Sequence, residues 1–128
     1  MKYLKLLPRF WKTILVLAII LSLCLFPGND ISKIDFLKIT YEDKVVHLIM
    51  FLGFSSMLFH DLQRNTELAN KMASLSFTVL AFCILLGITT EMLQLLLTSL
   101  NRTGSIMDFL FDMIGSGLGI TGMRLIKR

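Results

Sequence analysis

The chain has 128 residues, 55% of them hydrophobic, and its mean hydropathy is +0.73. A soluble domain of this length would expose much of that apolar surface to water, so the composition excludes an ordinary soluble domain and predicts a single membrane domain over residues 1–128. The formal net charge of +4 does not indicate nucleic acid, because the basic residues stand between apolar blocks and at the chain ends, where membrane topology places them.

The first apolar run follows a basic leader, MKYLKLLPRFWK, and a Pro-Gly-Asn turn at 27–29 ends it. A basic segment before an apolar one is also typical of a signal peptide, but no A-x-A cleavage pattern follows. We therefore expect an uncleaved membrane helix over about residues 10–26. Cys24 in this run, and Cys83 further on, have no cysteine or histidine at metal-ligand spacing, so we interpret both as small buried hydrophobic residues.

Three further apolar runs follow, and each predicts a helix. The second covers about residues 44–60, and its apolar part spans ~24 Å, somewhat short of a ~30 Å hydrocarbon core. A charged connection, DLQRNTELANK, separates it from the third run at about 72–98. The fourth run covers about 105–124 and follows an Asn-Arg-Thr-Gly turn. The predicted fold class is an all-α membrane protein with four transmembrane helices.

The lysines and arginines outside these helices predict the orientation. The N-terminal segment, the middle connection and the tail carry Lys2, Lys5, Arg9, Lys12, Arg64, Lys71, Arg124, Lys127 and Arg128. The other two connections carry fewer, namely Lys33, Lys38, Lys44 and Arg102, and acidic residues dilute them. Since cytoplasmic loops carry the excess of positive charge, we expect both termini in the cytoplasm and the connections 29–44 and 101–104 outside.

Polar and small residues line up on two of the predicted helices. The two sets are Gly87, Glu91, Gln94 and Thr98, spaced 4-3-4, and Ser105, Asp108, Asp112, Gly115, Gly119 and Gly122, spaced 3-4-3-4-3. Each spacing places its set on one helix face. With the predicted topology both faces meet the start of the second helix near the outer surface, and we expect nothing comparable at the inner ends. The candidate binding residues are Lys44, His47, Glu91, Gln94, Arg102, Asp108 and Asp112.

The cost of burying charge makes this cluster informative. A carboxylate at mid-bilayer costs about 2.5–3.5 kcal/mol, whereas a leucine or isoleucine gains only about 0.3–0.6 kcal/mol, and charges within a membrane indicate a functional site by default. Structural interpretations stay open beside the functional one. The flexible side chain of Lys44 can simply reach the surface, and His47 can be a hydrogen-bonded interior residue. Arg102 can pair with Asp108 or Glu91 only to fix helix packing.

Three segments, DKVVHLIMF, GITTEMLQ and NRTGSIMDFLFDMIGSGLG, resemble the VanZ-like family of small bacterial membrane proteins, between Asp43 and Gly119. The residues that carry the resemblance are, in order, Lys44, His47, Glu91, Gln94, Arg102, Asp108, Gly115 and Gly119. The two glycines allow close helix approach, which we expect within one chain. The family takes its name from a protein that confers low-level resistance to teicoplanin. The resemblance implies a multi-pass protein of the bacterial cytoplasmic membrane, although the family usually has asparagine where this chain has Asp112.

Three functions stay open. The first is a cell-envelope protein whose outer polar cleft recognises a lipid head group, a lipid-linked wall precursor or a glycopeptide, with Lys44 and Arg102 meeting a phosphate or carboxylate. The resemblance adds a contribution to teicoplanin-type resistance. The second is an intramembrane enzyme in which His47 is the acid–base group and Glu91 or Asp108 holds its tautomer. The third is a structural membrane anchor.

We expect no metal and no cofactor. The side chains of His47, Glu91, Asp108 and Asp112 have the chemistry of metal ligands, but their spacing lacks a signature of the H-E-x-x-H kind. No nucleophile with a recognisable motif accompanies them, so no catalytic residue is assigned. The expected partners are the lipid bilayer and a lipid-linked or cell-wall ligand, without nucleic acid, and the sequence does not indicate an oligomeric state.

Overall fold

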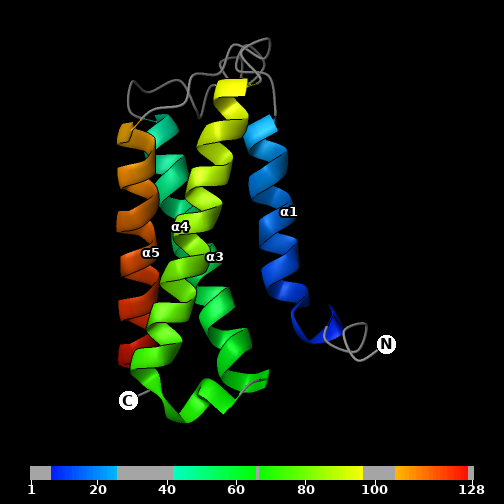
Figure 1. Ribbon diagram of the computed structural model, residues 1–128, viewed down its shortest axis with the longest axis vertical. Coiled ribbons are helices and arrows are strands. Elements are labelled where there is room, and N and C mark those ends of the chain that lie inside the picture. The colour runs from blue at the N-terminus through cyan, green and yellow to red at the C-terminus, as the bar shows by residue number, and fades with distance from the viewer. Residues whose placement is uncertain (1–6, 26–41, 66, 97–105, 127–128) are drawn as a thin grey trace.

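The computed structural model describes residues 7–25, 42–65, 67–96 and 106–126, and the regular structure within these ranges is helical. The elements in chain order are a 3-10 helix η2 (Leu7–Arg9), α1 (Trp11–Leu25), α3 (Glu42–Asn65), a 3-10 helix η4 (Glu67–Asn70), α4 (Met72–Leu96) and α5 (Ile106–Ile126). The four α-helices stand side by side along the long axis and alternate in direction (Figure 1). Helix α1 begins and α5 ends at the lower end of the bundle in this view.

Helix α3 is the centre of the bundle. It packs against α1, α4 and α5, and its most extensive contact is with α5. Two glycines explain how closely α3 and α5 approach. A Cβ at Gly115 would overlap the carbonyl oxygen of Leu48, and a Cβ at Gly119 would overlap the Ser55 hydroxyl and lie 2.7 Å from the carbonyl oxygen of Leu52. Small residues at such an interface are typical of helices that associate in a membrane.

The described core consists of aliphatic and aromatic side chains, and buried polar side chains lie beside it. Its buried hydrophobic members are Ile20, Phe51, Phe54, Leu58, Phe59, Leu62, Leu75, Val79, Cys83 and Ile120. Cys83 is buried as expected, whereas the side chain of Cys24 lies outside the described residues. Large apolar side chains also cover the outside of the bundle; Phe77, for example, is 73% exposed. An apolar exterior of this extent indicates that lipid, not water, surrounds the helices.

Three helices are long and apolar enough to cross a membrane: Lys44–Arg64 within α3, Met72–Leu96 and Ile106–Ile126. Helix α1 is apolar but has only 15 residues, and at 1.5 Å per residue it spans ~22 Å, less than a ~30 Å hydrocarbon core. The expectation of four transmembrane helices is therefore confirmed in part: the described residues form three helices of spanning length and one shorter apolar helix.

The observed bounds differ most at the end of α3. The other helices begin and end within two residues of the expected positions, but α3 runs to Asn65 and not to residue 60. The residues Asp61–Asn65, which the charged sequence suggests are a connection, continue the helix. The physical reason lies in Asp61, whose side chain is buried against α1.

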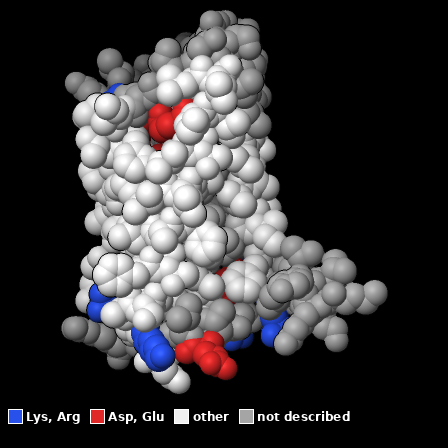
Figure 2. Space-filling view, viewed as in Figure 1, with Lys and Arg blue, Asp and Glu red and all other residues white. Residues whose placement is uncertain are grey.

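Charged groups concentrate at the ends of the bundle. The described basic residues at the lower end are Arg9, Lys12, Arg64, Lys71 and Arg124, whereas Lys44 lies at the start of α3, at the upper end. Figure 2 shows the basic atoms around the lower end, and the middle of the same face is almost free of charge. This distribution agrees with the sequence-based orientation, in which the lower end faces the cytoplasm, and that orientation stays a prediction.

Candidate functional site

The upper half of the bundle contains the polar cluster, by which we mean Lys44, His47, Glu91, Gln94, Asp108 and Asp112. Its closest contact joins α3 to α5, where His47 Nδ1 lies 2.8 Å from Asp112 Oδ1. Both side chains are buried, at 2% and 0% exposed. The contact is a hydrogen bond in which the imidazole N–H donates to the carboxylate. It fixes the orientation of the ring, because Nδ1 is then the nitrogen that carries the proton toward Asp112.

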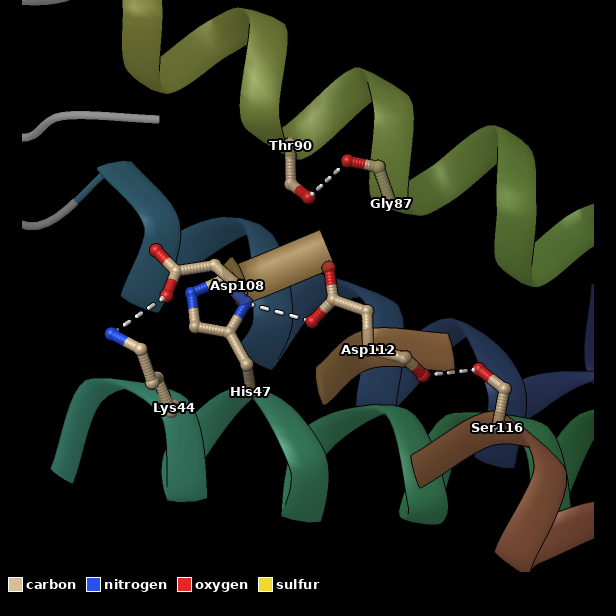
Figure 3. A network of polar contacts seen from close by, with 7 residues as sticks. All are labelled: Lys44, His47, Gly87, Thr90, Asp108, Asp112 and Ser116. Carbon is tan, nitrogen blue, oxygen red and sulfur yellow. Dashed lines mark hydrogen bonds and ion pairs between the residues drawn. The ribbon is translucent and has the colours of Figure 1, made fainter. Parts of the chain in front are cut away.

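A second contact between the same helices lies one turn nearer the upper end. Lys44 Nζ is 3.7 Å from Asp108 Oδ1, within ion-pair distance. The two partners differ in exposure, since the lysine side chain is 28% exposed and that of the aspartate 3%. Figure 3 shows Lys44 and His47 pointing from α3 toward the two aspartates of α5, with the imidazole ring between them. A buried carboxylate therefore holds a cation that still reaches the surface.

Helix α4 brings the third carboxylate to this place. Single ligand-type atoms of His47, Glu91 and Asp112 all lie within 4.8 Å of one another. Glu91 is partly buried, and Gln94, three residues further along α4, is 3% exposed. Among the described residues the Gln94 Oε1 atom has no hydrogen-bond partner. The three longest helices thus each contribute side chains to one polar region.

The buried polar face of α4 differs from the expected one. The buried residues of this helix are Leu75, Val79, Cys83, Gly87, Thr90 and Gln94, so Thr90 lies in the centre of the face and Glu91 lies beside it. The hydroxyl of Thr90 donates to the Gly87 carbonyl oxygen at 3.0 Å, which satisfies it within its own helix. A signal for this face exists in the sequence, because positions 83, 87, 90 and 94 follow the same 4-3-4 spacing.

On α5 the expected stripe is buried from Asp108 to Gly119, whereas Gly122 is only partly buried. Asp108, Asp112, Gly115 and Gly119 are all buried, and Ser116 is buried with them. The Ser116 hydroxyl donates to the main-chain oxygen of Asp112 at 2.7 Å. This bond connects Ser116 to Asp112, the residue that contacts His47. Arg102, Ser105 and Thr98, which the sequence also suggests, lie outside the described residues.

The lower half of the bundle contains a buried polar contact that the sequence does not predict. Asp61 is 3% exposed, and its Oδ2 atom accepts hydrogen bonds from the main-chain N–H of Thr13 at 3.2 Å and from its hydroxyl at 2.8 Å. His60 Nδ1 lies 3.5 Å from the other carboxylate oxygen. The expectation of nothing comparable at the inner ends is therefore wrong. Asp61 opens the charged segment that the sequence suggests is a connection, so its burial is not visible from local pattern.

The contact with Asp61 has a structural explanation. The first N–H groups of a helix have no partner within it, and a side chain at the preceding position usually satisfies one of them. Helix α1 begins after Phe10, whose side chain has no acceptor, and the first bond of the helix joins Ile14 N to Phe10 O at 2.9 Å. Asp61 of α3 supplies the missing acceptor and places a negative charge at the positive end of α1.

Comparison with known proteins gives one finding. A family model described as VanZ/LLP1 matches residues 3–127. No curated protein and no solved structure matches the chain significantly. The resemblance expected from the three sequence segments is thereby confirmed, and it extends over nearly the whole chain.

Proposed function

The chain belongs to the VanZ/LLP1 family, and from that premise we propose that it is a bacterial envelope membrane protein that binds a phosphate-bearing lipid head group through the polar cluster. Family membership suggests a membrane protein linked to teicoplanin resistance, and a contribution of this chain to such resistance is part of the proposal. The observation that carries the proposal is the pairing of the partly exposed Lys44 with the buried Asp108.

Lys44 has the features of an anion-binding residue. An ammonium group whose position is set by a carboxylate keeps further donor N–H bonds for a second anion. It stands at the start of α3, where the candidate span begins, so a membrane-spanning α3 would place it near the head groups. The carboxylate below it is buried in a helix of spanning length, at a cost that charge pairing reduces. A charged group buried at such a cost supports a role beyond packing.

Binding of one lipid pair tests the proposal. Purified protein in detergent is titrated with dioleoyl phosphatidic acid and, separately, with dioleoylglycerol, which lacks the phosphate, and complexes are measured by native mass spectrometry. We expect Lys44→Gln to weaken phosphatidic acid binding about tenfold or more, since a hydrogen bond to a charged group contributes about 1.5–3 kcal/mol. Lys71→Gln, at the exposed lower end, serves as the control and retains binding. Equal phosphatidic acid affinity of Lys44→Gln and the parent would contradict the proposal.

The same variants test the inherited phenotype. Expression of the parent protein in a susceptible strain is expected to raise the inhibitory concentration of teicoplanin, and Lys44→Gln is expected to raise it less at equal membrane abundance. An equal rise in the inhibitory concentration for both proteins would show that any resistance does not depend on the polar cluster.

A second candidate, an intramembrane acid–base enzyme, gains support from the His47–Asp112 hydrogen bond at 2.8 Å. A carboxylate that fixes the tautomer of a histidine is a common arrangement in general acid–base catalysis. The sequence-based hypothesis assigned that orienting role to Glu91 or Asp108, whereas the contact made is with Asp112. Turnover of a labelled lipid-linked precursor by the purified protein, lost in His47→Ala, would favour this function over binding alone.

A further inference from the structure

The structure points to a binding site for a divalent transition-metal ion, and we propose that His47, Glu91 and Asp112 are its protein ligands. One imidazole nitrogen and two carboxylate oxygens from these residues lie within 4.8 Å of one another. They come from α3, α4 and α5, so the packing of three helices sets their positions. This inference does not rest on head-group binding, since a metal is measured without lipid.

The distances fit a common ion. Bonds from a metal such as zinc to imidazole nitrogen or carboxylate oxygen are about 2.0–2.2 Å long, so two ligands of one ion lie up to roughly 4.4 Å apart. An upper limit of 4.8 Å therefore requires only small side-chain movements. One nitrogen with two oxygens suits zinc, manganese or iron, whereas calcium and magnesium prefer ligand sets made only of oxygen.

The surroundings supply what a metal site needs beyond its ligands. Gly87 leaves space beside Asp112, because a Cβ there would lie 3.5 Å from Asp112 Oδ2 and 3.1 Å from the Phe109 ring. The Ser116 hydroxyl holds the main chain of Asp112.

Gln94 gives an independent indication of a ligand. Its side chain is 3% exposed, and within the part of the chain that the structure describes its Oε1 atom accepts no hydrogen bond. A buried acceptor without a partner is costly. Gln94 lies three residues after Glu91, on a neighbouring position of the same helical surface. A water molecule bound to the metal would donate to this oxygen, since three protein ligands leave a coordination position open.

The hydrogen bond between His47 Nδ1 and Asp112 Oδ1 holds two of the proposed ligand residues side by side. Metal ligation by Nδ1 would require the proton on this nitrogen to move to Nε2, because a ligand nitrogen needs a free lone pair. The sequence-based expectation of no metal depended on the lack of a local signature. Ligands from three separate helices give no such signature, because their spacing in the chain is set by loops.

The test is a metal titration of the purified protein in detergent, with the affinity tag removed and prior metal stripped by chelation. Calorimetry with zinc and manganese chlorides gives affinity, and elemental analysis gives stoichiometry. We expect about one ion per chain, and a loss of affinity of at least about 100-fold in His47→Ala and Glu91→Gln. Glu91→Gln is the safer variant, because Glu91 is only partly buried and its replacement keeps the shape. Far-ultraviolet circular dichroism and gel filtration verify the fold.

One control variant and one spectrum make the outcome decisive. His60→Ala removes the histidine at the other end of α3, far from the proposed ligands, and should bind metal as the parent does. Cobalt substituted into the site should show an absorption spectrum without a sulfur-to-metal charge-transfer band, which excludes binding by the cysteines. The inference is overturned if the parent binds no metal, if His47→Ala and Glu91→Gln bind it equally well, or if His60→Ala abolishes binding.

Discussion

Gly115 of α5 lies against the main chain of Leu48 in α3, so that a Cβ at residue 115 would overlap the Leu48 carbonyl oxygen and lie 3.1 Å from its Cα. Leu48 directly follows His47, and Gly115 is three residues after Asp112. A close approach of the two helices therefore lies beside the hydrogen bond between those side chains. The contact of Gly115 with Leu48 therefore bears on both the packing of α3 against α5 and the geometry of the polar cluster.

Substitution at this contact should disturb both. We expect Gly115→Ala to lower the free energy of unfolding in detergent by about 1–3 kcal/mol, because the methyl group meets main-chain atoms that cannot rotate away. Gly117→Ala is the matched control on the same helix, since a Cβ there meets nothing within 4 Å, and alanine should be neutral or stabilising by up to about 1 kcal/mol. Thermal unfolding curves decide, and equal melting temperatures for the two variants would show that α3 and α5 are farther apart than described.

The charge of Asp112 is the subject of the second prediction. In chelator-treated protein, Asp112→Asn should melt at the same temperature as the parent or higher, because an amide oxygen can still accept from His47 Nδ1–H and the buried charge is gone. Asp112→Leu should lose about 1–3 kcal/mol, since it leaves the imidazole donor without its acceptor. If Asp112→Asn lowers the melting temperature as much as Asp112→Leu does, His47 is an imidazolium that needs the carboxylate charge.

Asp61 and Thr13 give a graded series at the lower end. Asp61→Ala removes the acceptor for two hydrogen bonds to the first turn of α1 and should cost about 1–2 kcal/mol. Asp61→Asn keeps an acceptor oxygen but loses the charge at the helix terminus, so about 0.3–1 kcal/mol is expected. Ser76→Ala, whose hydroxyl only donates to Met72 O in its own helix, should change little. Thermal unfolding in detergent measures all three variants. The melting temperature should be lowest for Asp61→Ala, intermediate for Asp61→Asn and highest for the parent, and any other order contradicts the capping role.

The α5 face could be predicted from sequence because polar groups in an apolar helix must turn inward, and the spacing from Asp108 to Gly119 specifies a single face. The buried face of α4 is more difficult to predict. Glu91 is the more conspicuous residue, but the apolar members Val79 and Cys83 share their face with Thr90, and an apolar residue in a lipid-facing helix gives no sign of which way it points. Periodicity is informative only where polar residues mark it.

Contacts between distant segments could not be predicted at all. Asp61 and Thr13 are 48 residues apart, and His47 and Asp112 are 65 apart. The sequence placed His47 and Asp112 in the same half of the bundle through topology, but which carboxylate meets the histidine depends on the rotation of α5 against α3. The charged segment after residue 60 predicts a solvent-exposed connection that includes Asp61, and only the contact with Thr13 of α1 shows that this residue is buried.

The orientation of the bundle is the last prediction, and it decides which compartment the polar cluster faces. Basic residues at the lower end predict that this end is cytoplasmic. In a background of Cys24→Ser and Cys83→Ala, Lys71→Cys, exposed at the lower end, should react with a membrane-impermeant maleimide only after the cells are permeabilised. Glu42→Cys, at the first residue of α3, should react in intact cells. The reverse pattern would place the cluster on the cytoplasmic side, where an external head group or glycopeptide could not reach it.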